Sequence, residues 1–357
     1  MTNNLDLRPL WAAQTIAVVG ATERVGAIGR LPIEYLTKFG FEGFIAPVNP
    51  KGGTILGLPA FQSMAEIPQH IELALIMVPA SSVREAVKDC AAAGVDVAIV
   101  MSSGFGEVDP DGQIAQQELV DIARADGMRL VGPNCIGSVG GAHRVMATFS
   151  PVFSSESTPL PAGNVALVSQ SGALGFGALS LGLERGVPIG IAITTGNEAD
   201  VTAVEVAAQL AQDPEVDAVA MYVESLGNMD QLIEVAGSKP IAILKAGRSV
   251  AGAAAAASHT GALASPDKVV SAVLTQNGIA RANNIDELLD IAALFASEKK
   301  ILGPAVGIVT TSGGSGILAV DALESEGLSL AELSAETVTA LEEIVPSYGN
   351  ATNPVDV

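Results

Sequence analysis

A short apolar strand pattern that runs directly into a glycine-rich turn and then into a helical pattern occurs three times in this sequence. The copies start near residues 15, 165 and 306. Strands that alternate with helices in this way form parallel sheets covered by helices, so we predict an α/β fold. The turn between such a strand and its helix exposes backbone N–H groups, which favours the binding of phosphate or another anion.

Length and composition predict a protein of two or three domains that does not bind nucleic acids. The chain has 357 residues, more than a single hydrophobic core usually organises. Hydrophobic residues make up 49% of the chain and charged residues 16%, so packed cores are expected rather than disorder. The formal net charge of -21 excludes a surface for a nucleic-acid backbone, which carries the same sign of charge.

Cysteine usage and hydropathy predict a cytoplasmic protein. Cys90 and Cys135 are too few for a disulfide framework and fit a reducing compartment. Residues 1–8 are polar and acidic, unlike a leader peptide, and no apolar run is long enough for a spanning helix. We therefore expect no contact with a membrane.

Residues 1–148 are predicted to form a Rossmann-like domain. Strand patterns and helical patterns alternate along this region, as in a parallel sheet with helices on its faces. Ligands of such sheets bind outside the carboxyl ends of the strands. The turns at Gly20, Pro79 and Ser103 should therefore face one crevice.

The end of the second strand in this region distinguishes between nucleotide ligands. It carries Asn49 and Lys51 where an NAD site usually has an acidic residue for the ribose hydroxyls. The first turn also lacks the strict G-x-G-x-x-G spacing. Asn49 and Lys51 suit a ligand with an additional phosphate, and the missing spacing makes the turn an unspecific indicator of a dinucleotide site. Alternatively, Lys51 is an ordinary solvated turn residue.

Cys135 is the candidate nucleophile of this region. No histidine lies near it in the sequence to activate it, so a buried thiol beside a ligand or in the core is the favoured interpretation. His70 and His143 lie in loop-like surroundings and are interpreted as incidental.

Residues 149–299 are predicted to form a flavodoxin-like domain, which a Ser- and Pro-rich linker at 149–163 introduces. Four strand patterns follow the linker. Ser169, Ser171 and Gly172 lie between the first strand and its helix, where the free N–H groups can bind an anion as readily as a capping side chain.

His259 lies in a Ser-His-Thr-Gly-Ala loop at 258–262, after a run of small residues. An imidazole can attack phosphorus and leave again, so this residue is a candidate carrier of a phosphoryl group. Glu224, at the end of the third strand of this domain, could accept a hydrogen bond from its ring. Alternatively, His259 is a structural residue and Glu224 an ordinary exposed acid.

Residues 300–357 repeat the strand, loop and helix of the second domain. We expect a second flavodoxin-like domain that is truncated in this chain. Its helix start at 312–316 and the earlier one at Ser171 could hold one phosphate between them, because each carries about half a positive charge. Alternatively, they are two unrelated capped helices.

Seven motifs, taken in their order and spacing, resemble the NDP-forming acyl-CoA synthetase family. This is the ADP-forming acetate–CoA ligase type, related to the succinyl-CoA synthetase alpha subunit. The motifs are segments 20–29, 47–51, 132–135, 169–172, 196–198, 258–262 and 312–314.

The resemblance implies roles for particular residues. It implies that His259 is phosphorylated and that Glu224 stabilises it. It implies that coenzyme A contacts Gly20, Ala21, Thr22, Val25, Gly26, Asn49, Lys51, Pro79, Ser103, Asn134 and Cys135. It implies that the phosphate is held by Ser169, Ser171, Gly172, Ser312, Gly313 and Gly314.

The implied reaction is carboxylate plus CoA plus ATP giving acyl-CoA, ADP and phosphate, through phosphohistidine and an acyl phosphate. The sequence contains no G-x-x-x-x-G-K-[ST] motif, and we find no ATP-grasp domain in it. ATP, ADP and Mg²⁺ should therefore bind an ATP-grasp domain or subunit outside this segment, and we expect an oligomer. The substrate should be a small carboxylic acid.

Two alternatives compete with this interpretation. The Rossmann-like start would also suit an NAD-dependent oxidoreductase, although Lys51 argues against it. A non-catalytic CoA-binding regulatory module would have the same first domain and an unphosphorylated His259.

Overall fold

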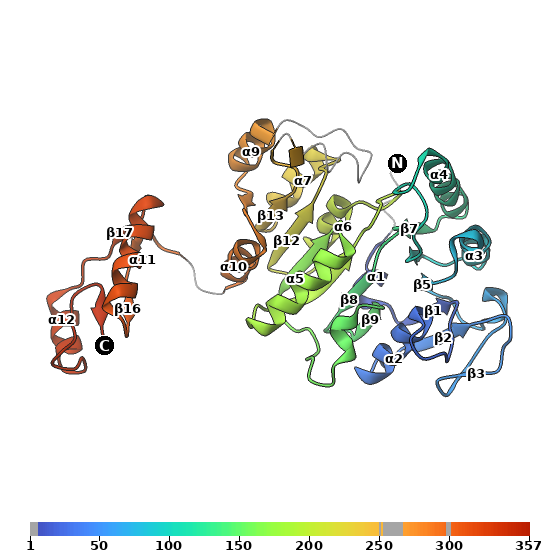
Figure 1. Cartoon of the computed structure of the whole chain (residues 1–357), viewed down its shortest axis with the longest axis horizontal. Coiled ribbons are helices and arrows are strands. Elements are labelled where there is room, and N and C mark those ends of the chain that lie inside the picture. The colour runs from blue at the N-terminus through green and yellow to red at the C-terminus, as the bar shows by residue number, and fades with distance from the viewer. Residues whose placement is uncertain (1–5, 250, 253–266, 298–300) are drawn as a thin grey trace. The chain divides into compact units, whose positions relative to one another are not determined.

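The computed structural model describes residues 6–249, 251–252, 267–297 and 301–357. It forms two compact units, one ending at Ala296 and one from Ser297 to Val357 (Figure 1). Each unit is described by itself.

The first sheet of the larger unit has five parallel strands in the order β2-β1-β5-β6-β7. The strands are β1 (Thr15–Val19), β2 (Phe44–Val48), β5 (Leu73–Ile76), β6 (Val97–Val100) and β7 (Arg129–Val131). The main helices between them are α2 (Leu31–Lys38), α3 (Ala80–Ala92) and α4 (Pro110–Ala125). Short elements are α1 (Pro9–Ala12), η1 (Ile28–Arg30), η2 (Met64–Glu66), β3 (Thr54–Ile55) and β4 (Leu58–Pro59).

Phe61 adds a one-residue strand outside β2. Its N–H donates to the carbonyl oxygen of Pro47, and its own carbonyl accepts from the N–H of Asn49, both at 2.9 Å. With this parallel bridge included, the chain order across the sheet is third, second, first, fourth, fifth and sixth. That is the Rossmann order.

Side chains of the central strands alternate between two apolar cores, because successive strand residues point to opposite faces. Ile16 and Val18 of β1 belong to the larger core, and Ala17 belongs to the smaller one. The smaller core includes buried residues of α3 and α4. The larger core continues into the second sheet, so one apolar interior joins the two sheets.

The second sheet has seven strands in the order β14-β13-β12-β10-β11-β8-β9. Its parallel strands are β10 (Val165–Ser169), β11 (Ile189–Thr194), β12 (Ala218–Val223), β13 (Ile241–Lys245) and β14 (Ala280–Arg281). They follow the flavodoxin-like order 2-1-3-4-5. The hairpin β8 (Gly137–Gly140) to β9 (Val145–Thr148) adds to β11 in antiparallel direction.

Helices cover both faces of this sheet (Figure 1). Helices α5 (Gly172–Glu184) and α10 (Ile285–Phe295) contact each other, and α6 (Ala203–Leu210) contacts α7 (Met229–Ala236). The other helical segments are α9 (Asp267–Gln276) and η3 (Pro151–Ser154). The predicted α/β class, with a Rossmann-like part followed by a flavodoxin-like part, is therefore confirmed.

The chain changes sheet between Val131 and Gly137, before the domain boundary that we predicted after residue 148. The hairpin at 137–148 is rich in glycine and gave no strand signal. At Gly140 a Cβ would lie 1.9 Å from the carbonyl oxygen of Trp11. The glycine therefore permits the close contact between α1 and β8.

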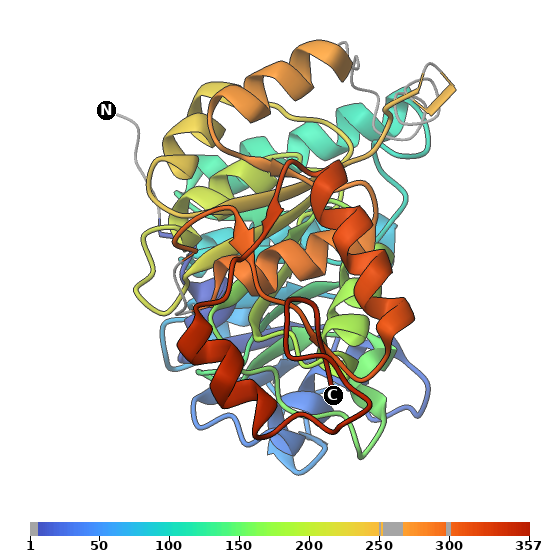
Figure 2. The ribbon, with the colours of Figure 1, turned by 90° about the vertical axis from the view of Figure 1, so that its left-hand side faces the viewer.

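The smaller unit contains two parallel strand pairs and two helices (Figure 2). Its elements are β15 (Ala305–Val306), β16 (Val309–Thr310), α11 (Gly313–Ser325), β17 (Ser329–Leu330), α12 (Ala335–Glu342) and β18 (Val355–Asp356). Within residues 301–357 only Gly316 and Val355 are buried.

In the parts of the chain that the structure covers, every helix is too short or too polar to cross a bilayer.

Candidate active site

A cavity of about 1000 Å³ lies where the carboxyl ends of both sheets meet. Its walls come from the turns after β1, β5, β6 and β7 of the first sheet and after β10, β11 and β12 of the second. In each sheet the chain order reverses within this set of strands, at β1/β5 and at β10/β12. Such switch points are where ligands bind in doubly wound folds. The volume is sufficient for a large cofactor.

The turn after β1 approaches the next strand so closely that it requires glycine. Gly20 has a φ of +91°, and a Cβ there would lie 2.6 Å from the carbonyl oxygen of Met77. The side-chain amide of Asn49 donates to the carbonyl of Ala21 at 2.8 Å and fixes the turn from the side of β2. The Gly20 turn is therefore a rigid wall of the cavity.

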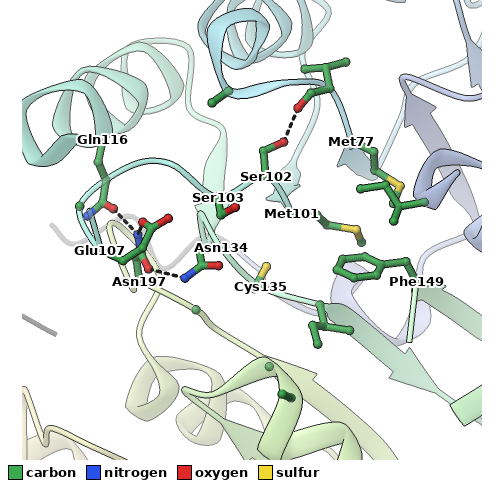
Figure 3. Close-up of a pocket in the computed structure, with 18 of the residues that line it drawn as sticks. Met77, Met101, Ser102, Ser103, Glu107, Gln116, Asn134, Cys135, Phe149 and Asn197 are labelled. Atoms are coloured by element: carbon green, nitrogen blue, oxygen red, sulfur yellow. Dashed lines mark hydrogen bonds between the residues drawn. The ribbon is translucent and has the colours of Figure 1, made fainter. Parts of the chain in front are cut away.

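One side of the cavity is apolar. Figure 3 shows Met77, Met101 and Phe149 together, with the thiol of Cys135 nearby. Met77 and Met101 are almost fully buried and are part of the larger core. This wall suits the uncharged part of a ligand.

The opposite side carries a hydrogen-bonded group of amides and a carboxylate (Figure 3). The amide of Asn197 donates to Glu107 at 2.6 Å and to Gln116 at 2.9 Å, and accepts from Asn134 at 3.3 Å. Burial raises the pKa of Glu107, but hydrogen bonds from the Gly104 N–H and from Asn197 outweigh it and lower that pKa. Glu107 is therefore an ionised acceptor in this network.

The two sheets are joined directly beside the cavity. The N–H of Asn197 donates to the carbonyl of Pro133 at 2.9 Å, and the N–H of Ala199 donates to that of Gly132 at 3.1 Å. Gly196 has a φ of +60°, and a Cβ there would lie 2.3 Å from the carbonyl oxygen of Pro133. The turn after β11 thus fits tightly against the turn after β7.

Glu198 is a buried carboxylate in the same turn. It accepts hydrogen bonds at 2.7 Å from the Thr195 hydroxyl, from the Ala203 N–H and from the amide of Gln170. Burial raises the pKa of Glu198, against the effect of these donors. The backbone of Glu198 has a φ of +54°, which is uncommon for a residue with a side chain.

The start of α5 and the end of β12 form a wall of the cavity on the side of the second sheet. Ser171 caps α5, its hydroxyl accepting from the N–H of Leu174 at 3.4 Å, and Gly172 begins the helix. Glu224 follows β12 and lines the cavity. Tyr222, two residues earlier, has its pKa raised to about 12 by burial and by a charged hydrogen-bond partner, Glu224. The site thus combines a helix N-terminus with a carboxylate.

Nine of the predicted site residues line this cavity: Gly20, Thr22, Pro79, Ser103, Asn134, Cys135, Ser171, Gly172 and Glu224. Six others do not: Ala21, Val25, Gly26, Asn49, Lys51 and Ser169. Ala21 is buried, whereas the side chain of Val25 points into solvent. Asn49 supports the Gly20 turn instead, and its side chain also accepts from the N–H of Lys51 at 2.9 Å.

The remaining predicted residues cannot be placed in the same cavity. Ser312, Gly313 and Gly314 open α11 in the smaller unit. Ser312 precedes the helix without a side-chain capping bond. His259 lies outside the described residues.

Cys135 is a buried thiol, as the sequence indicated. Its residue is 2% exposed, and its Sγ is 3.6 Å from the carbonyl oxygen of Val100. Burial raises the pKa of Cys135 to about 12, so the thiol is neutral at physiological pH. It does not have the properties of a nucleophile.

Several cavity residues were assigned no role from the sequence, although three of them lie in the motif segments 169–172 and 196–198: Met77, Met101, Glu107, Gln116, Phe149, Gln170, Asn197 and Glu198. Gln170, Asn197 and Glu198 lie in glycine-rich turns after strands, which is the signal that could have identified them. Glu107, Gln116 and Phe149 carry no such signal, because only the tertiary fold brings them to the cavity. Among the described residues there is no group of three or more His, Cys, Asp or Glu side chains placed to hold a metal ion.

Three family models match consecutive parts of the chain. A CoA binding domain matches residues 14–141, a succinyl-CoA ligase like flavodoxin domain matches 162–295, and a ligase-CoA domain matches 306–357. The first two meet at the cavity.

Similar proteins align along nearly the whole chain. The alpha subunit of ADP-forming acetate–CoA ligase I from Pyrococcus furiosus is 37% identical over 99% of this chain and 77% of its own length. ADP-forming acetate–CoA ligase I from Archaeoglobus fulgidus is 36% identical over 98% of this chain and 50% of its own length. The chain thus spans about three quarters of the first relative and half of the second.

A solved structure has the same fold. It is the dinucleotide-forming acetyl-coenzyme A synthetase 1 of Candidatus Korarchaeum cryptofilum in complex with phosphate and ADP. It superposes with a TM-score of 0.89 and 32% identity, over 98% of this chain and 75% of that one.

Proposed function

Since this chain belongs to the family of ADP-forming acetate–CoA ligase alpha subunits, we propose that it is the CoA-binding and acyl-transfer part of an ADP-forming acid–thiol ligase. The reaction is carboxylate plus CoA plus ATP giving acyl-CoA, ADP and phosphate. The observation that carries the proposal is the cavity shared by the two sheets. It brings a glycine turn of the CoA-binding part together with a helix start and a carboxylate of the ligase part.

Coenzyme A is proposed to bind along the first-sheet side of the cavity. Gly20 and Thr22 belong to the turn after β1 and line the cavity, and they are proposed to contact the phosphates of coenzyme A. Pro79, Ser103 and Asn134 line the path from there toward the second sheet. When bound, coenzyme A supplies the thiol that becomes the thioester.

His259 is proposed to carry the phosphoryl group, with Glu224 as its stabilising carboxylate. The imidazole nitrogen forms a bond to phosphorus as the nucleotide leaves, and a substrate carboxylate oxygen then takes over the phosphoryl group. In the resulting acyl phosphate, inorganic phosphate is the leaving group when the thiol attacks the acyl carbon. Ser171 and Gly172 at the start of α5 are proposed to hold the phosphate. Ser312, Gly313 and Gly314 are proposed to bind phosphate at the start of α11.

Four further features are also proposed. The name "subunit alpha" of the P. furiosus relative supports a partner subunit, which would carry the ATP-grasp part and bind Mg²⁺ with ATP. We propose that the domains comprise residues 1–148, 149–299 and 300–357. Two buried free thiols, Cys90 and Cys135, support a cytoplasmic location. The substrate is proposed to be a small carboxylic acid.

A half-reaction tests this proposal without the ATP-grasp part. The full chain is incubated with a panel of acyl-CoAs and labelled inorganic phosphate, which reverses thioester formation. We expect acid-labile label on the protein with the correct acyl group, and none in His259→Ala. Label that persists in His259→Ala would overturn the assignment of the phosphoryl carrier. Absence of label with every acyl-CoA, despite CoA binding, would instead favour a non-catalytic CoA-binding module.

A further inference from the structure

The peptide of Glu224 is held from both sides just beyond the end of β12. Regular pairing of β12 with β10 and β13 ends at Tyr222 and Val223. The side chain of Gln170, from the end of β10, accepts from the N–H of Glu224. The ammonium of Lys245, the last residue of β13, donates to the carbonyl of Glu224 at 3.3 Å. Side chains of the two neighbouring strands thus replace the missing sheet contacts.

Gln170 has its amide orientation fixed by the groups that it contacts. Its Nε2 donates to Glu198 Oε2 at 2.7 Å and to the carbonyl of Ser225 at 3.0 Å. Its Oε1 also accepts from the N–H of Ser225 at 3.0 Å. Because the backbone N–H groups of Glu224 and Ser225 can only donate, the Oε1 must face the turn, and the Nε2 then faces Glu198. The residue is only 8% exposed, so the amide has little freedom to turn.

Lys245 is a buried cation in the same place. It is 3% exposed, and its ammonium also donates to the carbonyl of Ala246 at 2.8 Å. Burial lowers the pKa of Lys245, which reflects the energetic cost of a charge in this position. A methionine or leucine would fill the same space without that cost. The ammonium donates to the Glu224 and Ala246 carbonyls, and the nearby carboxylate of Asp267 also favours its charge.

We propose that Gln170 and Lys245 are positioning residues that fix the Glu224 backbone, with Glu198 as the anchor of Gln170. This inference rests on the proposed function, in which the Glu224 carboxylate acts beside the phosphorylated histidine. The position of the Glu224 backbone determines where its carboxylate can lie. A displacement of about one ångström at a reacting group costs up to about 100-fold in rate.

The test uses the labelling rate of the full chain with acyl-CoA and labelled phosphate, measured in a single turnover. Gln170→Leu and Lys245→Met keep the side-chain size but remove the hydrogen bonds. Two control variants make the same substitutions away from the cavity, at a partly buried glutamine and an exposed lysine. Gln209→Leu removes an amide that accepts from the N–H of Leu7, and Lys38→Met removes an ammonium that donates to the carbonyls of Phe153 and Ser155.

We expect Gln170→Leu and Lys245→Met each to slow labelling by about 10- to 100-fold, while CoA affinity measured by calorimetry changes less than about twofold. Gln209→Leu and Lys38→Met should label at the wild-type rate. A loss of CoA affinity and melting temperature in parallel with the rate would indicate a merely structural role and overturn the proposal.

A double-mutant cycle with Glu224→Gln shows whether the two residues act through Glu224. If they do, Gln170→Leu should slow labelling much less in the Glu224→Gln background than in wild type. An undiminished effect in that background would overturn the inference while leaving the proposed function intact. A fully active Glu224→Gln would instead refute the role of Glu224 in the proposed function.

Discussion

At the residue scale, two glycines after β1 have the same kind of backbone conformation but differ in what an added side chain would contact. Gly20 and Gly26 both have positive φ, +91° and +80°. A Cβ at Gly20 would clash with the Met77 carbonyl, whereas a Cβ at Gly26 would have no atom within 4 Å. Alanine at either site costs about 1–2 kcal/mol for the left-handed conformation, and the clash at Gly20 adds about 1–3 kcal/mol.

Gly20→Ala should therefore lower the free energy of unfolding more than Gly26→Ala does. Chemical denaturation of the two variants measures the difference, and calorimetric titration with CoA shows whether the turn also binds the ligand. Equal losses of stability would contradict the close approach of the turn to β5.

Both cysteines should be unreactive in the native protein. Cys90 and Cys135 are buried, and burial raises the pKa of each to about 12. At pH 8 only about one thiol in 10,000 would then be ionised, and access is also blocked. Iodoacetamide followed by mass spectrometry should detect almost no modification before unfolding and complete modification in denaturant. Rapid labelling of Cys135 in the native protein would contradict the burial of its thiol in the cavity wall.

At the element scale, a buried carboxylate ties the two sheets together. Asp200, in the turn after β11, accepts from Arg124 at 2.5 Å, from Arg129 at 2.9 Å and from the N–H of Leu130 at 2.9 Å. Burial raises the pKa of Asp200, but these donors outweigh it and lower that pKa below its usual range. The side chain of Asp200 has no exposed surface.

Asp200→Asn should lower the free energy of unfolding by about 1–3 kcal/mol at neutral pH, because the neutral amide loses the charged hydrogen bonds with both arginines while Arg129 keeps Glu205 as a partner. The pKa of Asp200 is lower in the folded protein than in the unfolded chain, where it is about 3.9. Its contribution is therefore present above about pH 4 and is lost as pH falls through the folded value. Denaturation at several pH values should show the wild-type advantage shrink below about pH 4.

The exposed pair of Arg84 and Glu118 provides the control, since Glu118→Gln should change stability little. A pH-independent difference between wild type and Asp200→Asn would contradict the titration of Asp200.

Elements with strong apolar runs could be predicted from the sequence, and glycine-rich or isolated ones could not. Strands β1, β2 and β10 lie where the apolar runs placed them, because buried parallel strands are almost continuously hydrophobic. The segment at 149–163 was interpreted as a linker from its Ser and Pro content. It contains Phe153, which is fully buried and packs edge-on against the rings of Tyr35 and Phe39. The burial of this one aromatic side chain fixes the segment to the core, although most residues around it are polar or small.

At the scale of the whole molecule, the cavity could be predicted as a location but not as a set of contacts. Within each sheet the turns after the parallel strands share one edge, so Gly20 in the first sheet and Ser171 and Glu224 in the second were predicted to be site residues. Glu107 and Asn197 are 90 positions apart in the chain, and their hydrogen bond depends on how the two sheets pack. Sequence periodicity determines which face a residue is on and does not specify such packing.

The two units should differ strongly in local stability, and two helices of equal length make the comparison direct. Helices α5 and α11 both have 13 residues, and a serine precedes each one. Five residues of α5 are buried, whereas only Gly316 is buried in α11. Ile317 and Leu318 of α11 are 65% and 71% exposed. Full burial of such a side chain would stabilise the fold by about 1.5–3 kcal/mol, and most of this free energy is absent in α11.

Amide hydrogen exchange should therefore be slow in α5 and fast in α11. An isolated helix of this length is marginal in water, so its protection comes from packing rather than from propensity. We expect the amides of α5 to be protected at least about 100-fold more than those of α11, as between a core element and a locally unfolding one. Mass spectrometry of peptides from both helices measures the ratio in one sample. Equal protection would mean that α11 is covered in solution by apolar surface that the described residues do not provide.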